Sequence, residues 1–368
     1  MPETSAMQHL SDAISLTDYE TTARTRLPAG PWAYFQGGAG DEVTMRRNAE
    51  AWQTHTLRPR VMRVLAGGHS RSTLLGRPLA CPVLAAPVAY QRMAHAEGEI
   101  GTALATSVLG MGMVLSTQSS TPLEEVASAA GDRATRGPLW FQLYLQPDLG
   151  LTRSLVQRAE AAGYDAIVLT VDAPCQGVRD RERRAGFRLP PGIRAVHLPP
   201  ASSQPTPAGG SAASLFDGLL AQAPTWDDLA WLCTETTLPV LVKGVLHPDD
   251  ARLAIQHGAA GVIVSNHGGR TLDTALPTAR ALPDICAALE GAVPVLVDGG
   301  IRRGTDVLKA LALGAHAVLI GRPLVHGLAC GGTHGVAHVL RLLHDEFEAA
   351  MALCGCRTLS DIQPGLLA

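Results

Sequence analysis

Two residues suited to acid–base chemistry lie just after short apolar runs of the sequence. His267 follows the run Gly261–Ser265, and Asp172 follows the run Ala166–Val171. An imidazole can act as a general base, and a carboxylate beside it can orient the ring and stabilise its protonated form. We therefore predict that His267 takes a proton from a substrate and that Asp172 supports it.

Cationic side chains follow or end neighbouring runs. Arg179 lies shortly after Asp172, Arg270 lies shortly after His267, and Lys243 ends a further run. Two guanidinium groups match the geometry of a carboxylate, and a lysine can stabilise negative charge that develops in a reaction. These residues predict an anionic substrate whose carboxylate binds Arg179 and Arg270.

Glycine-rich turns follow the last two apolar runs. Gly300 and Gly321 would let backbone N–H groups approach an anion, and Arg302 and Arg322 would add charge-assisted hydrogen bonds. Parallel α/β barrels commonly bind phosphate after their seventh and eighth strands. This end of the chain therefore predicts a site for a phosphorylated ligand or cofactor.

The elements that must position these residues alternate between apolar runs and amphipathic stretches. The runs lack apolar–polar alternation, which is typical of strands buried on both faces of a parallel sheet. Eight strands, each followed by a helix or loop, predict an α/β fold of the (β/α)₈ TIM-barrel type. The expected strands are Val83–Ala86, Met113–Ser116, Leu139–Tyr144, Ala166–Val171, Pro239–Lys243, Gly261–Ser265, Pro294–Asp298 and Ala317–Ile320.

The chain reads as one domain over residues 1–368. We expect a helical N-terminal cap in 1–75, the barrel in 76–330, and a C-terminal helix and tail in 331–368. Residues 186–225 are rich in Pro, Ser, Gly and Ala, and they are far longer than an ordinary loop after a fourth strand. Because this segment follows the catalytic end of that strand, it predicts a mobile lid loop.

Composition restricts the classes of function. Of 368 residues, 46% are hydrophobic and 17% charged, which excludes disorder over most of the chain. The net charge of −3 gives no overall basic field for binding nucleic acid or an anionic membrane. No apolar stretch is long enough to span a membrane, and no signal peptide is recognisable. The seven cysteines form no framework, so we expect reduced thiols in a cytoplasmic protein.

Other polar features are assigned to structure or solvent. His334 and His338 have i, i+4 spacing and Cys354 and Cys356 form a C-x-C pair, but no further ligands accompany them. We therefore predict no metal site. The basic run Arg181–Arg184 is interpreted as a solvated stretch beside the lid.

Three motifs carry a family resemblance: Ser265–Arg270 (SNHGGR), Asp298–Gly304 (DGGIRRG) and Ile320–Pro323 (IGRP). They are similar to the FMN-dependent 2-hydroxy-acid oxidase/dehydrogenase family, which includes glycolate oxidase, lactate oxidase and mandelate-oxidising enzymes. Phe141–Tyr144 (FQLY) and Leu241–Gly244 (LVKG) fit the same pattern in order, and the resemblance covers about residues 17–360.

The resemblance implies oxidation of an (S)-2-hydroxy acid to the 2-oxo acid, with FMN as cofactor and His267 as base. Oxygen, giving H₂O₂, or another acceptor would reoxidise the flavin, and the protein would be a homotetramer. Asp172, Lys243, Tyr144 and Arg270 would also be catalytic, while Tyr34, Tyr144, Arg179 and Arg270 would bind substrate. The residues that would bind FMN are Pro87, Val88, Ala89, Ser116, Gln142, Thr170, Lys243, Ser265, Asp298, Gly300, Arg302, Gly321 and Arg322.

Departures from the glycolate-type pattern concern the substrate side chain. Gln118 stands where a tryptophan is frequent, Gln176 replaces an aliphatic residue, and Tyr90 replaces a methionine. Two glutamines would cost binding energy against an alkyl group unless they found hydrogen-bond partners. We therefore expect a substrate larger or more polar than glycolate, with mandelate-like acids among the candidates.

Several alternatives remain open at the level of sequence. Within the family, the protein could be a dehydrogenase or a monooxygenase, and the proton could leave the α-carbon or the hydroxyl. A phosphate-binding barrel without flavin, such as an aldolase or isomerase, is a second class. A catalytically silent scaffold is a third, against which the complete set of polar strand-end residues argues.

Overall fold

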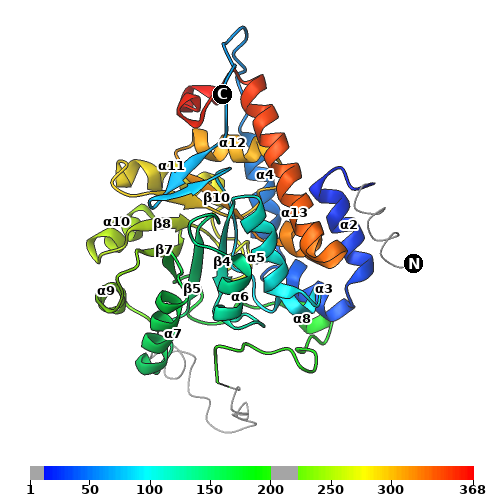
Figure 1. Ribbon diagram of the computed structural model, residues 1–368, viewed down its shortest axis with the longest axis vertical. Helices are drawn as coiled ribbons and strands as arrows, with labels where there is room; N and C mark the ends of the chain where they lie inside the picture. The colour runs from blue at the N-terminus through cyan, green and yellow to red at the C-terminus, as the bar shows by residue number, and fades with distance from the viewer. Residues whose placement is uncertain (1–11, 200–222) are drawn as a thin grey trace.

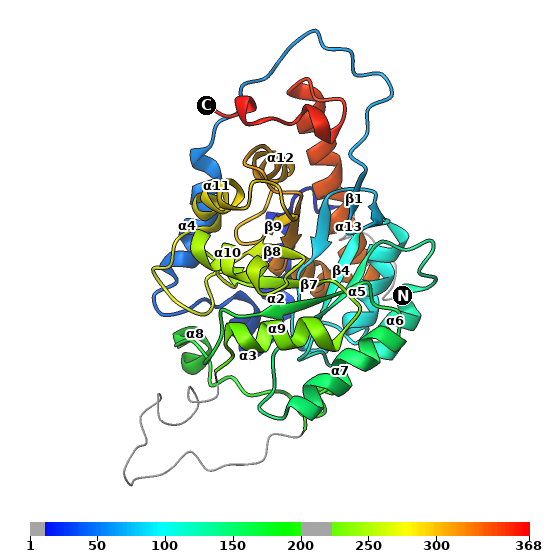
Figure 2. The same cartoon turned by 90° about the vertical axis from the view of Figure 1, so that its left-hand side faces the viewer.

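The computed structural model describes residues 12–199 and 223–368, and its centre is a closed barrel of eight parallel strands (Figures 1 and 2). This confirms the predicted (β/α)₈ barrel. The predicted lid loop 186–225 falls largely on residues 200–222, which lie outside the described residues. The barrel strands are β3 (Val83–Ala85), β4 (Gly112–Ser116), β5 (Leu139–Leu143), β6 (Ala166–Thr170), β7 (Val240–Val245), β8 (Gly261–Val264), β9 (Val295–Val297) and β10 (Ala317–Ile320).

Each strand is apolar on both faces because each face meets a separate core. Side chains such as Trp140, Val168 and Leu296 fill the interior of the barrel. The alternate residues, such as Phe141 and Ile167, pack outward against the surrounding helices. A strand buried on both sides therefore needs a continuous apolar run, which is why the strands could be located from the sequence.

Helices follow the strands and cover the outside of the barrel (Figure 1). Their ends agree with local capping signals: α10 begins with Pro248 after the capping residue His247, and α9 begins after Thr225 in a capping box with Asp228. The helices are α5 (Gly98–Val108), α6 (Leu123–Ala130), α7 (Leu149–Ala161), α8 (Asp180–Arg184), α9 (Trp226–Glu235), α10 (Pro248–Gln256), α11 (Thr278–Leu289), α12 (Gly304–Ala312) and α13 (Arg322–Leu353).

The N-terminal cap is helical over only part of the predicted range 1–75. Its described helices are α2 (Leu16–Arg26), α3 (Ala29–Gln36) and α4 (Val43–Thr54). The chain is then irregular up to a short strand, so the described helices of the predicted cap end at Thr54. Pro59 and the Gly67-Gly68 pair disfavour a continued helix in this stretch.

A hairpin that was not predicted from the sequence closes the end of the barrel at which the strands begin. It pairs β1 (Ser72–Leu74) with β2 (Arg77–Leu79) in antiparallel register. Leu74 and Leu79 are buried in the same cluster as the side chains that fill the barrel interior. The hairpin therefore seals the end opposite the carboxyl ends of the strands.

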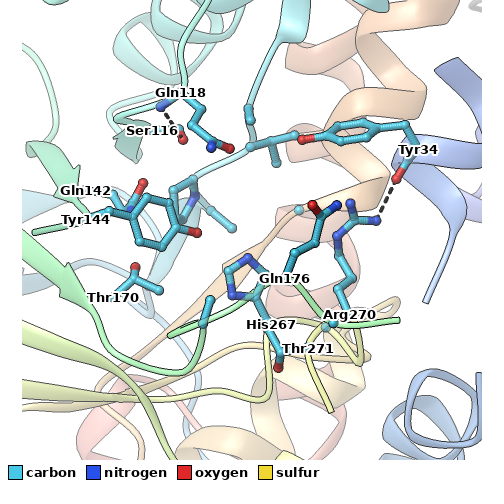
Figure 3. Close-up of a pocket in the computed structure, with 18 of the residues that line it drawn as sticks. Tyr34, Ser116, Gln118, Gln142, Tyr144, Thr170, Gln176, His267, Arg270 and Thr271 are labelled. Atoms are coloured by element: carbon cyan, nitrogen blue, oxygen red, sulfur yellow. Dashed lines mark hydrogen bonds between the residues drawn. The ribbon is translucent and has the colours of Figure 1, made fainter. Parts of the chain in front are cut away.

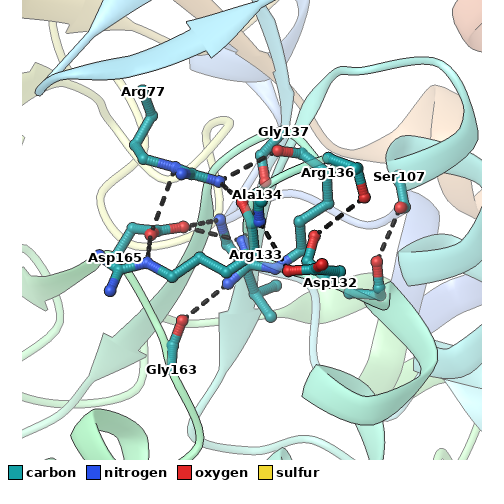
Figure 4. Close-up of polar contacts among 12 residues, drawn as sticks. Arg77, Ser107, Asp132, Arg133, Ala134, Arg136, Gly137, Gly163 and Asp165 are labelled. Atoms are coloured by element: carbon teal, nitrogen blue, oxygen red, sulfur yellow. Dashed lines mark hydrogen bonds and ion pairs between the residues drawn. The ribbon is translucent and has the colours of Figure 1, made fainter.

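A polar network lies beside this hairpin (Figure 4). The buried carboxylate of Asp165, just before β6, pairs with Arg133 at 2.7 Å, Arg136 at 2.8 Å and Arg77 at 3.4 Å. Asp165 also accepts a hydrogen bond from the backbone N–H of Leu139, the first residue of β5. One carboxylate therefore connects the hairpin to the beginnings of two barrel strands.

The last helix, α13, is bent where Gly331 and Gly332 leave helical dihedral angles. The part before the bend follows β10, in the position of the eighth barrel helix. The part after the bend packs on α2 and α5, which ties the end of the chain to the N-terminal cap. None of the helices in the described residues is long and apolar enough to cross a membrane.

Candidate active site

A cavity of about 1300 Å³ opens at the carboxyl ends of the barrel strands. This is the end of a (β/α)₈ barrel at which catalytic residues collect. Every predicted site residue lines the cavity except Asp172 and Ser265, and each of these two hydrogen-bonds to a residue that does. Figure 3 shows side chains from the N-terminal cap and from several strand ends pointing into one space.

The predicted base and its carboxylate are in direct contact. Nδ1 of His267 lies 2.9 Å from Oδ1 of Asp172, and the imidazole borders the cavity. His267 has a backbone φ of +57° and is followed by Gly268 and Gly269, which also have positive φ. This left-handed turn costs energy at a residue other than glycine, and such strain is common at functional sites. The arrangement leaves Nε2 of the imidazole for a ligand.

Asp172 is held in its ionised form by its neighbours. Burial alone would raise the pKa of this carboxyl, but His267 and Lys243 outweigh burial and lower its pKa. Gly244 allows the close packing, because a Cβ at this position would lie 2.5 Å from the Cβ of Asp172. The glycine has a φ of +114° and lies at an irregularity in the pairing of β7 with β8.

Lys243 is a buried cation with two polar partners. Its Nζ lies 3.1 Å from Oδ2 of Asp298 and donates to Oγ of Ser265 at 3.0 Å. Burial alone would lower the pKa of Lys243, but Asp298 and Asp172 outweigh burial and raise it. The same Ser265 hydroxyl accepts a hydrogen bond from the backbone N–H of His267, so the lysine and the base share one support.

The two predicted carboxylate-binding arginines lie together at the cavity wall. Nη1 of Arg270 donates to the carbonyl oxygens of Tyr34 at 2.6 Å and Gly37 at 2.7 Å, and its guanidinium lies 5.1 Å from the centre of the Tyr34 ring. Burial, together with the charge of Arg179, lowers the pKa of Arg270.

Glu182 is a site residue that the sequence reading missed. Its buried carboxylate oxygen Oε1 accepts from Arg179 at 3.1 Å and from Arg270 at 3.5 Å. The interpretation of Arg181–Arg184 as a wholly solvated stretch was therefore wrong at Glu182, and Arg181 is paired with Glu42. The i, i+3 spacing from Arg179 was the available signal, but a charged run by itself does not show which side chain points inward.

Aromatic side chains form the wall near the N-terminal cap. The ring of Tyr34 stacks on Phe187 at 4.9 Å and meets Tyr90 edge-on at 5.9 Å. Burial raises the pKa of Tyr34, and burial together with Asp172 raises the pKa of Tyr144. Both phenols therefore keep their protons and can donate hydrogen bonds to an anionic ligand.

The predicted phosphate site contains two partly buried arginines, Arg302 and Arg322. Arg322 donates to the carbonyl oxygens of Gly268 at 2.9 Å and Gly37 at 3.0 Å. Burial, reinforced by Arg270 and Arg302, lowers the pKa of Arg322 to about 9. Clustered guanidinium groups that repel one another in a buried site favour binding of an anion.

Buried polar atoms without a partner test whether the cavity fits FMN. Nε2 of Gln142, Oγ1 of Thr170, Oδ1 of Asp298 and Nε of Arg322 have no hydrogen-bond partner in the part of the chain that is described. All four residues line the cavity. Amide and hydroxyl donors suit the edge of a flavin ring, a carboxylate suits a polyol chain, and a guanidinium suits a phosphate. The unpaired atoms therefore match the three parts of FMN.

Gln118 and Gln176 both line the cavity. Figure 3 shows their side chains, from the loops after β4 and β6, entering the space shared by Tyr34 and His267. The loop carrying Gln118 is held in place, because the carbonyl oxygen of Gln118 accepts from the backbone N–H of Tyr90 at 3.1 Å. Both amides therefore face the same space as the imidazole of His267 and the ring of Tyr34.

The fold and the site define a class: a (β/α)₈ barrel with a histidine–aspartate pair and two neighbouring arginines in one cavity, whose unpaired polar atoms match FMN. The profile of the FMN-dependent dehydrogenase family matches residues 23–368. The chain belongs to this family, and it is an FMN-dependent oxidoreductase of the 2-hydroxy-acid oxidase class. The resemblance stated from the sequence motifs is thereby confirmed, as is the prediction of FMN.

Relatives match over almost their entire length. The chain is 48% identical to an L-lactate oxidase of Nostoc sp., over 98% of this chain and 100% of that protein. It is 44% identical to a glycolate oxidase of Spinacia oleracea, over 95% of this chain and 94% of the other. A solved structure of mandelate oxidase with benzoyl-formic acid superposes with a TM-score of 0.86 at 41% identity, covering 97% of this chain and 98% of that one.

Proposed function

We propose that the protein oxidises an (S)-2-hydroxy acid to the corresponding 2-oxo acid, with His267 as the base. The contact between His267 and Asp172, beside two arginines in one cavity, is the observation that supports this proposal. Arg179 and Arg270 bind the substrate carboxylate, and Tyr34 and Tyr144 donate hydrogen bonds to its oxygens. Nε2 of His267 takes the proton that leaves the α-carbon or the hydroxyl of the substrate. The ionised Asp172 stabilises the imidazolium that results.

FMN, when bound, accepts the two electrons that leave the substrate. Lys243 supplies a fixed positive charge where negative charge develops, and Asp298 and Ser265 hold its ammonium group. Gln142 and Thr170 offer hydrogen-bond donors to the ring, and Asp298 offers an acceptor to the ribityl hydroxyls. The remaining residues proposed to hold FMN are Pro87, Val88, Ala89, Ser116, Ser265, Gly300, Arg302, Gly321 and Arg322.

Replacing the base tests this assignment. We expect His267→Gln to keep FMN and lower turnover by about 10²- to 10⁴-fold, because glutamine cannot accept the proton. The measurement is the rate of flavin bleaching by substrate without oxygen. His316→Gln is the matched control, since His316 is exposed at the opposite end of the barrel and should leave the rate unchanged. A His267→Gln enzyme that bleaches at the parental rate would contradict the proposal.

We propose that the substrate is larger or more polar than glycolate. Gln118 and Gln176 replace apolar contacts with amides, and Tyr90 and Phe187 provide an aromatic wall beside Tyr34. Lactate oxidases and a mandelate oxidase are among the similar proteins. These observations favour side chains between the methyl group of lactate and the phenyl group of mandelate.

A panel of acids tests this substrate range. The value of kcat/KM should be higher for (S)-lactate or (S)-mandelate than for glycolate or (S)-2-hydroxyoctanoate. An unpaired buried amide costs about 1–3 kcal/mol, so we expect about a tenfold or greater penalty for the long alkyl chain. A clear preference for glycolate or 2-hydroxyoctanoate would show that this reading of the two glutamines is wrong.

We propose that O₂ is the acceptor and is reduced to H₂O₂. The similar proteins are named as oxidases, which supports this choice over the dehydrogenase and monooxygenase alternatives. An oxygen electrode with a peroxide assay distinguishes the three. An oxidase forms one H₂O₂ for each 2-oxo acid, a dehydrogenase consumes little O₂, and a monooxygenase releases CO₂ and a shortened acid.

We further propose that the protein is a homotetramer in the cytoplasm and that residues 186–225 form a lid.

All seven cysteines are free, which supports a reducing compartment. Val61, Met62 and Val64 are 78–100% exposed on one irregular segment, which supports association with other copies of the chain. Light scattering after size-exclusion chromatography tests the tetramer, cell fractionation tests the compartment, and limited proteolysis with and without substrate tests the lid.

A further inference from the structure

We propose that Glu182 is an internal counter-anion: it binds the two arginines in place of the substrate carboxylate and so weakens the binding of that carboxylate. The inference rests on the proposed function, in which Arg179 and Arg270 bind the substrate carboxylate. It adds a residue that sets substrate affinity without touching the reacting atoms.

One oxygen of Glu182 contacts both guanidinium groups. Oε1 lies 3.1 Å from Nη1 of Arg179 and 3.5 Å from Nη2 of Arg270. The exposed fraction of the Glu182 side chain is 9%, and the fractions for the arginines are 15% and 14%. All three residues line the cavity, and because their exposed fractions are low, water screens their interactions only weakly.

Arg270 does not need Glu182 to keep its place. The carbonyl oxygens of Tyr34 and Gly37 bind its Nη1 at 2.6 and 2.7 Å, and its guanidinium lies over the Tyr34 ring. Arg179 has fewer contacts: besides Glu182, its Nε donates to the carbonyl oxygen of Arg270 at 3.4 Å. The main effect of Glu182 on Arg270 is therefore electrostatic.

The charges explain why such a group should lower affinity. Two guanidinium groups and one carboxylate leave a single net positive charge at the site. Without Glu182 the arginines would repel each other, and the charge of Arg179 contributes to lowering the pKa of Arg270. A substrate carboxylate must share the arginines with Glu182 and also faces its negative charge at short range. Removing that charge should strengthen the binding of any small carboxylate.

The test compares three variants of the FMN-loaded enzyme. Glu182→Gln removes the charge and keeps the shape. Asp180→Asn removes a charge from the same helix at a partly exposed residue that pairs with Arg183 and Arg184 instead. Arg179→Gln removes one of the two arginines proposed to bind the carboxylate. The probe is oxalate, an unreactive carboxylate, with its Kd measured from the change in flavin absorbance. For Glu182→Gln we expect the Kd to fall about tenfold, and KM for the hydroxy acid to fall with kcat within about twofold. For Asp180→Asn we expect no change.

The outcomes separate this proposal from the function on which it rests. If Arg179→Gln weakens oxalate binding but Glu182→Gln does not strengthen it, the counter-anion proposal is wrong and Glu182 only positions Arg179. If Arg179→Gln binds oxalate as the parent does, the carboxylate site itself is wrong, and both proposals fail. Should Glu182→Gln not fold, Glu182→Asp keeps the charge, but its shorter side chain moves the carboxylate away from the two arginines. A Kd for oxalate equal to or above that of the parent would then overturn the proposal.

Discussion

At the scale of single residues, the site is a row of neighbouring charged side chains, each of which stabilises the charge of the next. Asp298 binds Lys243, Lys243 and His267 both lower the pKa of Asp172, and Asp172 contacts the imidazole of His267. Each buried charge thus has an opposite charge beside it, as a buried ion requires. Changing one member should disturb the others, even where the substrate does not touch it.

Asp172→Asn tests this coupling through pH. The pKa of Asp172 is lowered by folding, so its charge contributes stability above the ordinary value of 3.8, and this contribution is lost as the pH falls through the lower folded value. We expect the variant to be about 3 kcal/mol less stable at pH 7, and the difference to shrink below pH 3.8. Urea unfolding of the apoprotein at pH 7 and at a pH below 3.8 measures this difference in stability. A difference that did not depend on pH would contradict the assignment.

Most site residues could be predicted because they are polar groups at the ends of apolar runs. His267, Lys243 and Arg322 belong to this kind. Glu182 could not be predicted, because it lies in a run of alternating charges on a five-residue helix. Whether such a side chain faces solvent or the cavity depends on how the loop after β6 packs against Arg270, which is a tertiary contact distant in sequence.

At the scale of elements, the ends of the barrel have different tasks. Strands end at the cavity in ionisable side chains, and they begin at the opposite end beside the network around Asp165 (Figure 4). In this fold, residues at the end where the strands begin usually stabilise the barrel, while residues at the carboxyl ends carry the catalytic groups. A change at the end where the strands begin should therefore affect stability and leave the chemistry intact.

Asp165→Asn tests that separation. It leaves Arg136, whose side chain is 3% exposed, without its anionic partner, and breaking such a buried pair costs about 3–5 kcal/mol. Thermal and urea unfolding should show this loss, while kcat of the folded enzyme stays within about twofold. Glu235→Gln is the control, because its pair with Arg153 lies at the surface, where water screens it, and its loss should cost far less stability. Equal losses in the two variants would contradict the prediction.

The strands were predictable to within one or two residues and the hairpin was not, for a physical reason. Barrel strands are buried on both faces and must be apolar throughout. Each strand of the β1–β2 hairpin has three residues, of which only the last, Leu74 or Leu79, is buried. One apolar side chain in three gives no periodic pattern, so the hairpin depends on tertiary packing against the barrel interior.

At the scale of the whole molecule, the segment between α4 and β1 projects from the body near the C-terminus (Figure 2). Its apolar residues would be costly to leave in water if the chain acted alone. We expect Met62→Glu, or Val61→Asp, to dissociate the proposed tetramer, because each places a charge in an apolar contact. Light scattering measures the mass in solution. Val108→Asp, at an equally exposed position on α5, should leave the mass unchanged; a shift there instead would move the interface to α5.

The seal formed by Leu74 and Leu79 has a consequence for the order in which the protein is loaded. Because the hairpin closes the end at which the strands begin, FMN and the hydroxy acid would both enter through the opening at the carboxyl ends of the strands. Arg270 and Arg322, one assigned to each ligand, both hydrogen-bond to the carbonyl oxygen of Gly37, so the two compartments adjoin. An acid that arrives first stands in the path of the flavin. A newly made chain surrounded by abundant substrate should therefore mature into holoenzyme more slowly than one made in its absence.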